Sequence, residues 1–207
     1  MSQIYKVFIN NFFLSFIPDS NPKNYLLKSI KFDYKLISSY RDLMTYLNSK
    51  NYFLDKNIIY ITDSPLSCFK KFKSQFNFIV AAGGVVQNKH KDVLMIYKNQ
   101  IWDLPKGKIE NNENSEKTAI RELKEETNVE IKYINSQSFS TYHMYCIKSK
   151  IYLKETKWFL MSSNCKNELI PQISEGIKKV KWVRSHNLNQ IKTYTLIKDV
   201  FTFFLNY

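Results

Sequence analysis

The chain has 207 residues, of which 44% are hydrophobic and 15% are aromatic. This length and composition allow one sizeable core, or one medium core with a small companion domain. The longest apolar stretches, such as 12–17 and 200–205, fall far short of the roughly 20 residues that a membrane helix needs. We therefore predict no membrane-spanning helix and no membrane partner.

The cysteines and the net charge bound the compartment and the partners. Cys68, Cys146 and Cys165 stand at wide spacings without a CxxC pair, which predicts neither a disulfide framework nor a zinc site and favours the reducing cytoplasm. The formal charge of +13 favours polyanionic ligands, because a positive potential concentrates phosphate-bearing molecules. Drift toward AT-rich codons would produce the same basicity, so the charge alone identifies no partner.

The local patterns change character near Phe76, which predicts a small α/β domain of unknown role over residues 1–76 and a second domain over 77–207. The elements predicted in the first domain are strands at 4–9 and 12–17 around an Asn10–Asn11 turn, a helix capped by Ser39 or Ser38, a strand at 57–62, and a helix that begins at Ser64–Pro65. The aromatic residues of the last helix recur at helical spacing, which indicates core packing rather than a base-binding surface.

The second domain alternates strand-like and helix-like patterns. The predicted strands cover 78–86, 93–97, 139–147, 151–161 and 180–183, with a helix over about 114–127 and a closing amphipathic helix that begins near Ser185. Helices mixed among strands with both long and hairpin connections predict an α/β fold, an α/β/α sandwich around a mixed β-sheet.

Three glutamates give the predicted helix near 114–127 its chemical interest. Asn114 or Ser115 can cap it, and Asn128 can end it in the left-handed conformation. Glu122, Glu125 and Glu126 then stand at i, i+3 and i+4, on neighbouring turns of one face. Oxygen ligands at this density suit hard cations such as Mg²⁺ or Mn²⁺.

An ordinary solvated helix would also explain these glutamates, because neighbouring Lys and Arg side chains can pair with them. The preceding loop argues against that reading. Gly107 can bring its backbone close to a ligand, and Lys106 and Lys108 flank it with ammonium groups that can hold phosphates. A phosphate-holding loop that leads into a metal-holding helix suits phosphoryl chemistry.

The segment from Gly107 to Val129 resembles the Nudix box, GX5EX7REUXEEXGU, where U is aliphatic. Gly107 matches the first glycine, Glu113 the next acid, Arg121-Glu122-Leu123 the REU element, and Glu125-Glu126 the acidic pair. Asn128 replaces the last glycine, and asparagine is the next-best residue for a left-handed helix end. Ala81–Val86 and Trp102–Pro105 extend the resemblance, which implies a Nudix-type α/β/α sandwich over about residues 77–190.

The resemblance implies roles for the matched residues. Glu122, Glu125 and Glu126 would hold Mg²⁺, or Mn²⁺ as a substitute, together with the carbonyl of Gly107, and the metal would activate the water that attacks phosphorus. Arg121 and Glu113 would orient these carboxylates. Glu175, in a loop before the strand at 180–183, is a candidate for a further ligand or general base; a surface acid in a turn is the alternative.

Other residues are candidates for substrate binding. Lys106 and Lys108 would contact phosphates, and Trp102 and His143 would line the substrate pocket, although core packing of the indole and a structural histidine are the simpler readings. A lysine before the box glycine resembles Nudix members that act on longer phosphate chains, dinucleoside polyphosphates or inositol pyrophosphates, which favours a nucleotide or polyphosphate substrate such as a dinucleoside polyphosphate.

Three alternatives stay open. The chain could be an ADP-sugar pyrophosphatase, an RNA 5′-end pyrophosphohydrolase, or a non-catalytic Nudix module that senses a ligand. The presence of every box glutamate favours an enzyme over the sensing module. RNA is the less favoured substrate, and the sequence leaves open the oligomeric state, a homodimer included.

Overall fold

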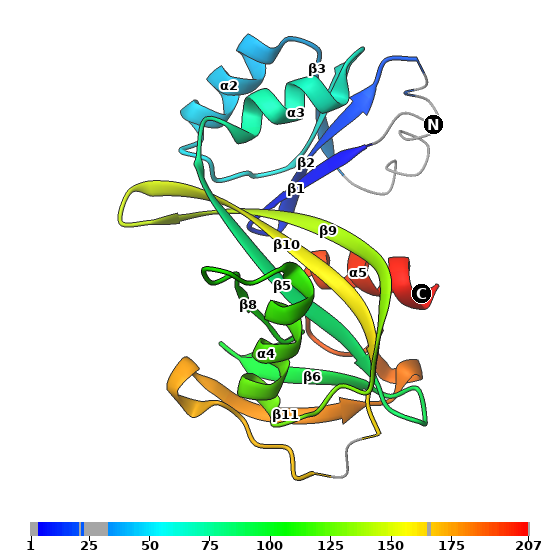
Figure 1. Ribbon diagram of the computed structural model, residues 1–207. Helices are drawn as coiled ribbons and strands as arrows, with labels where there is room; N and C mark the ends of the chain where they lie inside the picture. The colour runs from blue at the N-terminus through cyan, green and yellow to red at the C-terminus, as the bar shows by residue number, and fades with distance from the viewer. Residues whose placement is uncertain (1–3, 21, 23–32, 165–166, 207) are drawn as a thin grey trace. The chain divides into compact units, whose positions relative to one another are not determined.

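The computed structural model describes residues 4–20, 22, 33–164 and 167–206, and its labelled elements are drawn in Figure 1. The chain forms two compact units. The first comprises 1–79 with 142–154, and the second comprises 80–141 with 155–207. Whether residues 1–76 and 77–207 are separate domains stays a prediction. Among the described helices, none combines the length and the apolar character needed to cross a membrane.

The first unit is a small α/β layer. Its elements are β1 (Tyr5–Ile9), β2 (Phe12–Pro18), β3 (Tyr34–Ile37), α2 (Tyr40–Ser49), β4 (Asn57–Thr62), α3 (Pro65–Lys73), and the ends of β9 (Tyr133–Ile147) and β10 (Lys150–Ser162). β1 and β2 form an antiparallel hairpin around Asn10, whose φ of 49° places it in the left-handed region that asparagine tolerates. β2 pairs with β4, β3 with β4, and β1 with β9, all in parallel.

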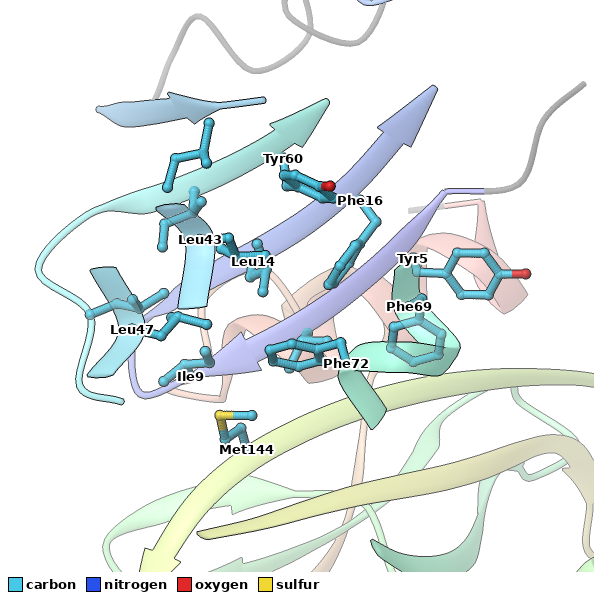
Figure 2. Packing of buried hydrophobic residues seen from close by; sticks show 14 of the residues in the cluster. Tyr5, Ile9, Leu14, Phe16, Leu43, Leu47, Tyr60, Phe69, Phe72 and Met144 are labelled. Carbon is cyan, nitrogen blue, oxygen red and sulfur yellow. The ribbon is translucent and has the colours of Figure 1, made fainter. Parts of the chain in front are cut away.

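The core of the first unit lies between its sheet and two helices. Ser39 caps α2 by accepting a hydrogen bond from the amide of Asp42 at 3.4 Å, which turns Leu43 and Leu47 inward. From α3, Phe69 and Phe72 pack against Phe16, and Figure 2 shows these side chains converging with Met144 of β9 below them. The predicted turn at Asn10–Asn11, both helices and the strands at 4–9, 12–17 and 57–62 are confirmed.

The second unit carries the glutamate-rich helix. Its elements are β5 (Asn77–Gln87), β6 (Val93–Lys98), β7 (Ile101–Asp103), β8 (Lys106–Lys108), α4 (Ser115–Thr127), the remaining lengths of β9 and β10, β11 (Ile177–Val183) and α5 (Thr195–Leu205), with 3₁₀ turns at Ile173–Glu175 and Ser185–Asn187. The strand order is β11-β6-β5-β10-β9, with β7 beside β6 and β8 beside β5.

Helices cover both faces of this sheet. On β5, Val86 belongs to the cluster that contains Ala119 and Leu123 of α4, whereas the adjacent Val85 belongs to the cluster that contains Val200 of α5. Because successive side chains of a strand point to opposite faces, α4 and α5 lie on opposite sides. The predicted α/β/α arrangement around a mixed sheet is confirmed.

The prediction that the last helix begins near Ser185 is wrong. α5 begins at Thr195, after the 3₁₀ turn Ser185–Asn187. The intervening segment is held by β7: the amide of Trp102 donates to the carbonyl of Lys192 at 3.0 Å, and the hydroxyl of Thr193 donates to the carbonyl of Trp102 at 2.8 Å. A residue engaged in such a bridge with a strand cannot continue a helix, although the apolar pattern runs through it.

The described cysteines, Cys68 and Cys146, are free thiols. Cys165 lies outside the described residues. The cytoplasmic location stays a prediction.

Candidate active site

The helix α4 is fixed at both ends by asparagine. The side chain of Asn114 accepts a hydrogen bond from the amide of Lys117 at 2.9 Å, which satisfies one of the free amides of the first turn. Asn128 has a φ of 61°, so the expected left-handed helix end is confirmed. Ala119 and Leu123 pack into the core, and this orientation directs Glu122 and Glu126 toward the sheet.

Gly107 lies directly against the carboxylate of Glu122. It pairs with Ala82 across β5 and β8, and a Cβ built on Gly107 would overlap the carboxyl atoms of Glu122. No side chain other than hydrogen fits between this strand and the helix. The glycine therefore lets the backbone of β8 approach the acidic face of α4.

Arg121 organises the acidic face. Its Nε and Nη2 donate to the two carboxylate oxygens of Glu113 at 2.8 and 2.9 Å, which is a bidentate pair. Its Nη1 donates to Glu122 at 2.9 Å and to Glu125 at 3.1 Å. Nη2 also donates to the carbonyl of Lys108 at 3.2 Å, so one guanidinium links the loop, the helix start and two of the three glutamates.

These contacts shift the pKa values of Glu113 and Arg121 in the directions that favour their charged forms. The hydrogen bonds from Arg121 and from the hydroxyl of Thr118 lower the pKa of Glu113 to about 2. The hydrogen bond to Glu113 raises the pKa of the Arg121 guanidinium. Both groups are ionised at neutral pH, and their ion pair holds the guanidinium in a fixed position beside Glu122.

The inner carboxylates are buried and carry the opposite shift. Glu126 is only 2% exposed and accepts a hydrogen bond from the amide of Lys106 at 2.8 Å. Burial raises the pKa of Glu126 to about 7, because its effect is larger than the lowering effect of that hydrogen bond. Burial also raises the pKa of Glu122. Two carboxyls held away from water on one helical face are destabilised as anions unless a cation compensates them.

Glu175 lies close enough to act electrostatically on this pair. Its loop is attached to the end of α4, since the amide of Gln172 donates to the carbonyl of Glu126 at 3.3 Å and that of Ile170 to the carbonyl of Thr127 at 3.2 Å. The charge of Glu175 raises the pKa of both Glu122 and Glu126. Its own carboxylate is half exposed and pairs with Lys98 of β6 at 3.5 Å.

The two lysines beside Gly107 differ in their surroundings. The ammonium of Lys106 pairs with Asp103 at 2.5 Å, donates to the carbonyl of Leu104 at 3.1 Å, and lies over the ring of Trp158 at 5.7 Å from its centroid. It is already engaged inside the protein. Lys108 is exposed and contributes its carbonyl to Arg121.

The two remaining candidates, Trp102 and His143, lie against residues other than the glutamates. Trp102 of β7 packs partly into the cluster under α5, tilted against the ring of Tyr97 at 5.1 Å, and lines a pocket of about 260 Å³ with Arg184 and Asn187. His143 belongs to the first unit, where it is in register with Phe8 of β1. Their roles in substrate binding stay predictions.

Sequence reasoning missed the groups that hold the predicted residues in place. Asp103 engages Lys106, Thr118 donates to Glu113 at 2.7 Å, and Lys98 pairs with Glu175. Thr118 stands five positions after Glu113 at the start of the helix, and this spacing was the available signal. The Lys98–Glu175 pair joins a strand to a loop far away in the sequence, so no local pattern predicts it.

The chemical type of the candidate ligand atoms fits a hard divalent cation. Every candidate ligand at this face is an oxygen atom, from Glu122, Glu125, Glu126 and the backbone of Gly107, and such cations prefer oxygen. Within the described part of the chain, no three acidic, histidine or cysteine side chains already converge as a ligand set. Here the guanidinium of Arg121 supplies the positive charge that Glu122 and Glu125 share.

The buried carboxyl of Glu126 predicts an unusual pH dependence of stability in the absence of divalent cations. Its pKa rises from 4.5 to about 7 on folding, so the folded protein binds this proton more tightly. Its contribution to the free energy of unfolding is full below about pH 4.5 and is lost as the pH rises through 7, a change on the order of 3 kcal/mol.

Urea unfolding in EDTA, from about pH 5 to pH 8, measures this effect. Glu126→Gln should remove most of the decline and should be more stable than the wild type at about pH 8. The matched control is Glu116→Gln, an exposed acid in the first turn of α4, which should follow the wild type. Equal slopes in the wild type and Glu126→Gln would contradict the assignment of Glu126 as the buried acid.

Comparison with known proteins gives curated relatives that match part of the chain. The chain is 29% identical over 125 residues to mRNA-decapping enzyme subunit 2 of Saccharomyces cerevisiae (strain YJM789), a match that spans 58% of this chain and only 12% of that protein. The m7GpppN-mRNA hydrolase of S. cerevisiae (strain S288c) matches to the same extent. The chain therefore corresponds to a small part of the curated relatives that it matches.

Solved structures are similar at lower identity. A Caenorhabditis elegans Ap4A hydrolase in a binary complex is 24% identical with a TM-score of 0.47, covering 62% of this chain and 99% of that one. A MutT protein from Methanosarcina mazei Go1 is 17% identical with a TM-score of 0.49, covering 64% and 96%. The family model described as the NUDIX domain matches residues 77–203. Because this match covers more than half of the chain, the protein belongs to the Nudix hydrolase family.

Proposed function

We propose that this protein hydrolyses a phosphoanhydride bond in a nucleotide-linked or polyphosphate substrate, with Mg²⁺ as the working cation and Mn²⁺ as a substitute. The observation that carries the proposal is the placement of the buried carboxylate of Glu122 directly against the backbone of Gly107, with Glu126 buried on the same helical face. This arrangement concentrates carboxylate oxygens beside the glycine of β8, which suits a cation that also binds phosphate oxygens.

Each residue of the site has a role in this proposal. Glu122, Glu125, Glu126 and the carbonyl of Gly107 hold the cation, which when bound neutralises phosphate oxygens and activates the attacking water. Arg121 and Glu113 keep the carboxylates oriented, because the bidentate pair fixes the guanidinium. Glu175 is the candidate general base, since it stands beside Glu122 and Glu126 on a loop anchored to α4.

Two substrate classes are supported by different observations. Dinucleoside polyphosphates were favoured by Lys106, but its ammonium is engaged by Asp103, so Lys108 is the exposed cation that supports them. A second candidate is the 5′ end of RNA. It is supported by the similarity to the mRNA-decapping enzyme and by the charge of +13, which favours a polyanion.

A panel of substrates tests the proposal. Dinucleoside polyphosphates, ADP-ribose, nucleoside triphosphates and capped RNA are incubated with Mg²⁺, with and without EDTA, and products formed in ¹⁸O-labelled water show which phosphorus is attacked. We expect cation-dependent cleavage of at least one anhydride. Salt then separates the two candidates, because RNA binding weakens steeply with added salt while a compact nucleotide is affected less. Cleavage of none of them would contradict the proposed function.

A further inference from the structure

The far ends of β9 and β10 form a hairpin, residues 142–154, that belongs to the first unit. Its turn consists of Lys148 and Ser149, with φ values of 48° and 62°. Two successive left-handed residues make a tight turn of the kind that matches the twist of paired strands. The hairpin is therefore a regular two-stranded ribbon on which successive side chains alternate between two faces.

One face of the ribbon is part of the N-terminal core. Met144 and Leu153 are buried there, and Tyr142 and Ile151 pack against the same cluster. Figure 2 shows Met144 directed from β9 toward the residues of that core. By alternation, the side chains of His143 and Tyr145 point to the opposite face.

The opposite face carries a row of aromatic rings. The rings of Tyr145 and Tyr152 are stacked, with centroids 5.8 Å apart and planes 16° apart, which places Tyr152 of β10 on the same face as Tyr145 of β9. The ring of His143 follows at 5.4 Å from Tyr145. Both tyrosines are only half-buried, so part of each side chain is accessible to a ligand.

The charge of the hairpin has a single sign. Residues 142–154 contain Lys148, Lys150 and Lys154 and no aspartate or glutamate. Lys148 in the turn and Lys150 directly after it are exposed, and Ile147 before the turn is 51% exposed. A ribbon with stacked rings on one face and exposed lysines at its turn has the composition of a surface that binds single-stranded nucleic acid, in which bases stack on rings and phosphates contact cations.

We propose that this hairpin face binds single-stranded RNA, with bases stacked on Tyr145 and Tyr152 and phosphates contacted by Lys148 and Lys150. A duplex is excluded as the ligand because its bases are already stacked on one another and cannot reach the rings. The choice of RNA over DNA rests on the proposed function, through its RNA 5′-end candidate. The stacking itself requires no catalysis, so binding is measured independently of hydrolysis.

Fluorescence anisotropy tests the inference, with the full chain in EDTA so that no hydrolysis occurs. The probes are a labelled oligouridylate of about 12 nucleotides, the matching oligothymidylate, and an RNA duplex of the same length. We expect the oligouridylate to bind more tightly than the duplex. Tyr145→Ala and Tyr152→Ala should each weaken binding about 10-fold, whereas Tyr145→Phe, which keeps the ring, should bind as the wild type does.

The lysines have a separate readout. Lys148→Ala and Lys150→Ala should each flatten the slope of log affinity against log salt by about 0.7, while Lys89→Ala, an exposed lysine in the turn between β5 and β6, should leave the slope unchanged. Circular dichroism and urea unfolding establish that each variant is folded.

Three results would overturn the inference. The first is a folded Tyr145→Ala/Tyr152→Ala double variant that binds oligouridylate as tightly as the wild type does. The second is a wild-type protein that binds the duplex as tightly as the single strand. The third is binding of oligothymidylate without binding of oligouridylate. A protein that cleaves small anhydrides but binds no RNA sinks this inference alone. A protein that binds RNA at the hairpin but cleaves nothing supports the inference and sinks the proposed function alone.

Discussion

Glutamine in place of Glu125 or Glu126 should reduce turnover of a phosphoanhydride substrate by about 1,000-fold or more, because a cation ligand contributes several kcal/mol to stabilising the transition state. The amide keeps the shape of each side chain but removes its negative charge. Glu125 is the cleaner position, since its side chain is 46% exposed and its replacement has little effect on packing. Glu126→Gln should combine low turnover with higher stability in EDTA, which is a trade-off common at active sites.

The measurement is kcat at saturating Mg²⁺ and substrate, on whichever compound of the panel is cleaved fastest. Glu116→Gln is the matched control, because it makes the same chemical change on an exposed first-turn position of the same helix. We expect it to retain wild-type kcat. Full activity in both Glu125→Gln and Glu126→Gln would be incompatible with cation binding at this face.

Local sequence signals predicted the glutamate helix because its determinants are local. The caps at Asn114 and Asn128 depend on a few neighbouring residues, and the i, i+3, i+4 spacing fixes the shared face of Glu122, Glu125 and Glu126. The contact that this helix makes with the sheet depends on residues outside the helix. The fit of Glu122 against Gly107 arises from pairing between β5 and β8, and only the resemblance to the Nudix box pointed to it.

Sequence patterns missed one short strand and two consequences of long-range pairing. β3 has only four residues, two of them exposed in the middle, so it lacks the alternation that identifies a strand. The ends of β9 and β10 join the first unit because β1 pairs in parallel with β9 near Met144, a contact between residues far apart in the chain. The start of α5 was misplaced for the same reason, since the bridge from Trp102 to Thr193 is invisible to the apolar pattern.

Arg121→Lys should reduce kcat about 10- to 100-fold, the range observed when a residue that orients a metal ligand is replaced. The guanidinium makes five hydrogen bonds, to Glu113, Glu122, Glu125 and the carbonyl of Lys108. A lysine retains the charge but has one nitrogen in place of three, so it cannot bind Glu113 through two atoms and reach Glu122 as well. The carboxylates would remain but lose their fixed orientation.

Two further measurements separate this positioning role from simple loss of charge or of folding. Lys124→Gln removes an exposed cation of the same helix that pairs with Glu130 at 2.9 Å, and it should leave kcat unchanged. In Arg121→Lys we expect the Mg²⁺ concentration at half-maximal activity to rise together with the loss of kcat, since misoriented ligands bind a cation more weakly. A folded Arg121→Lys variant with wild-type kcat and wild-type Mg²⁺ dependence would show that the geometry of this guanidinium does not support the acidic face, and the orientation of Glu122 would then require another cause.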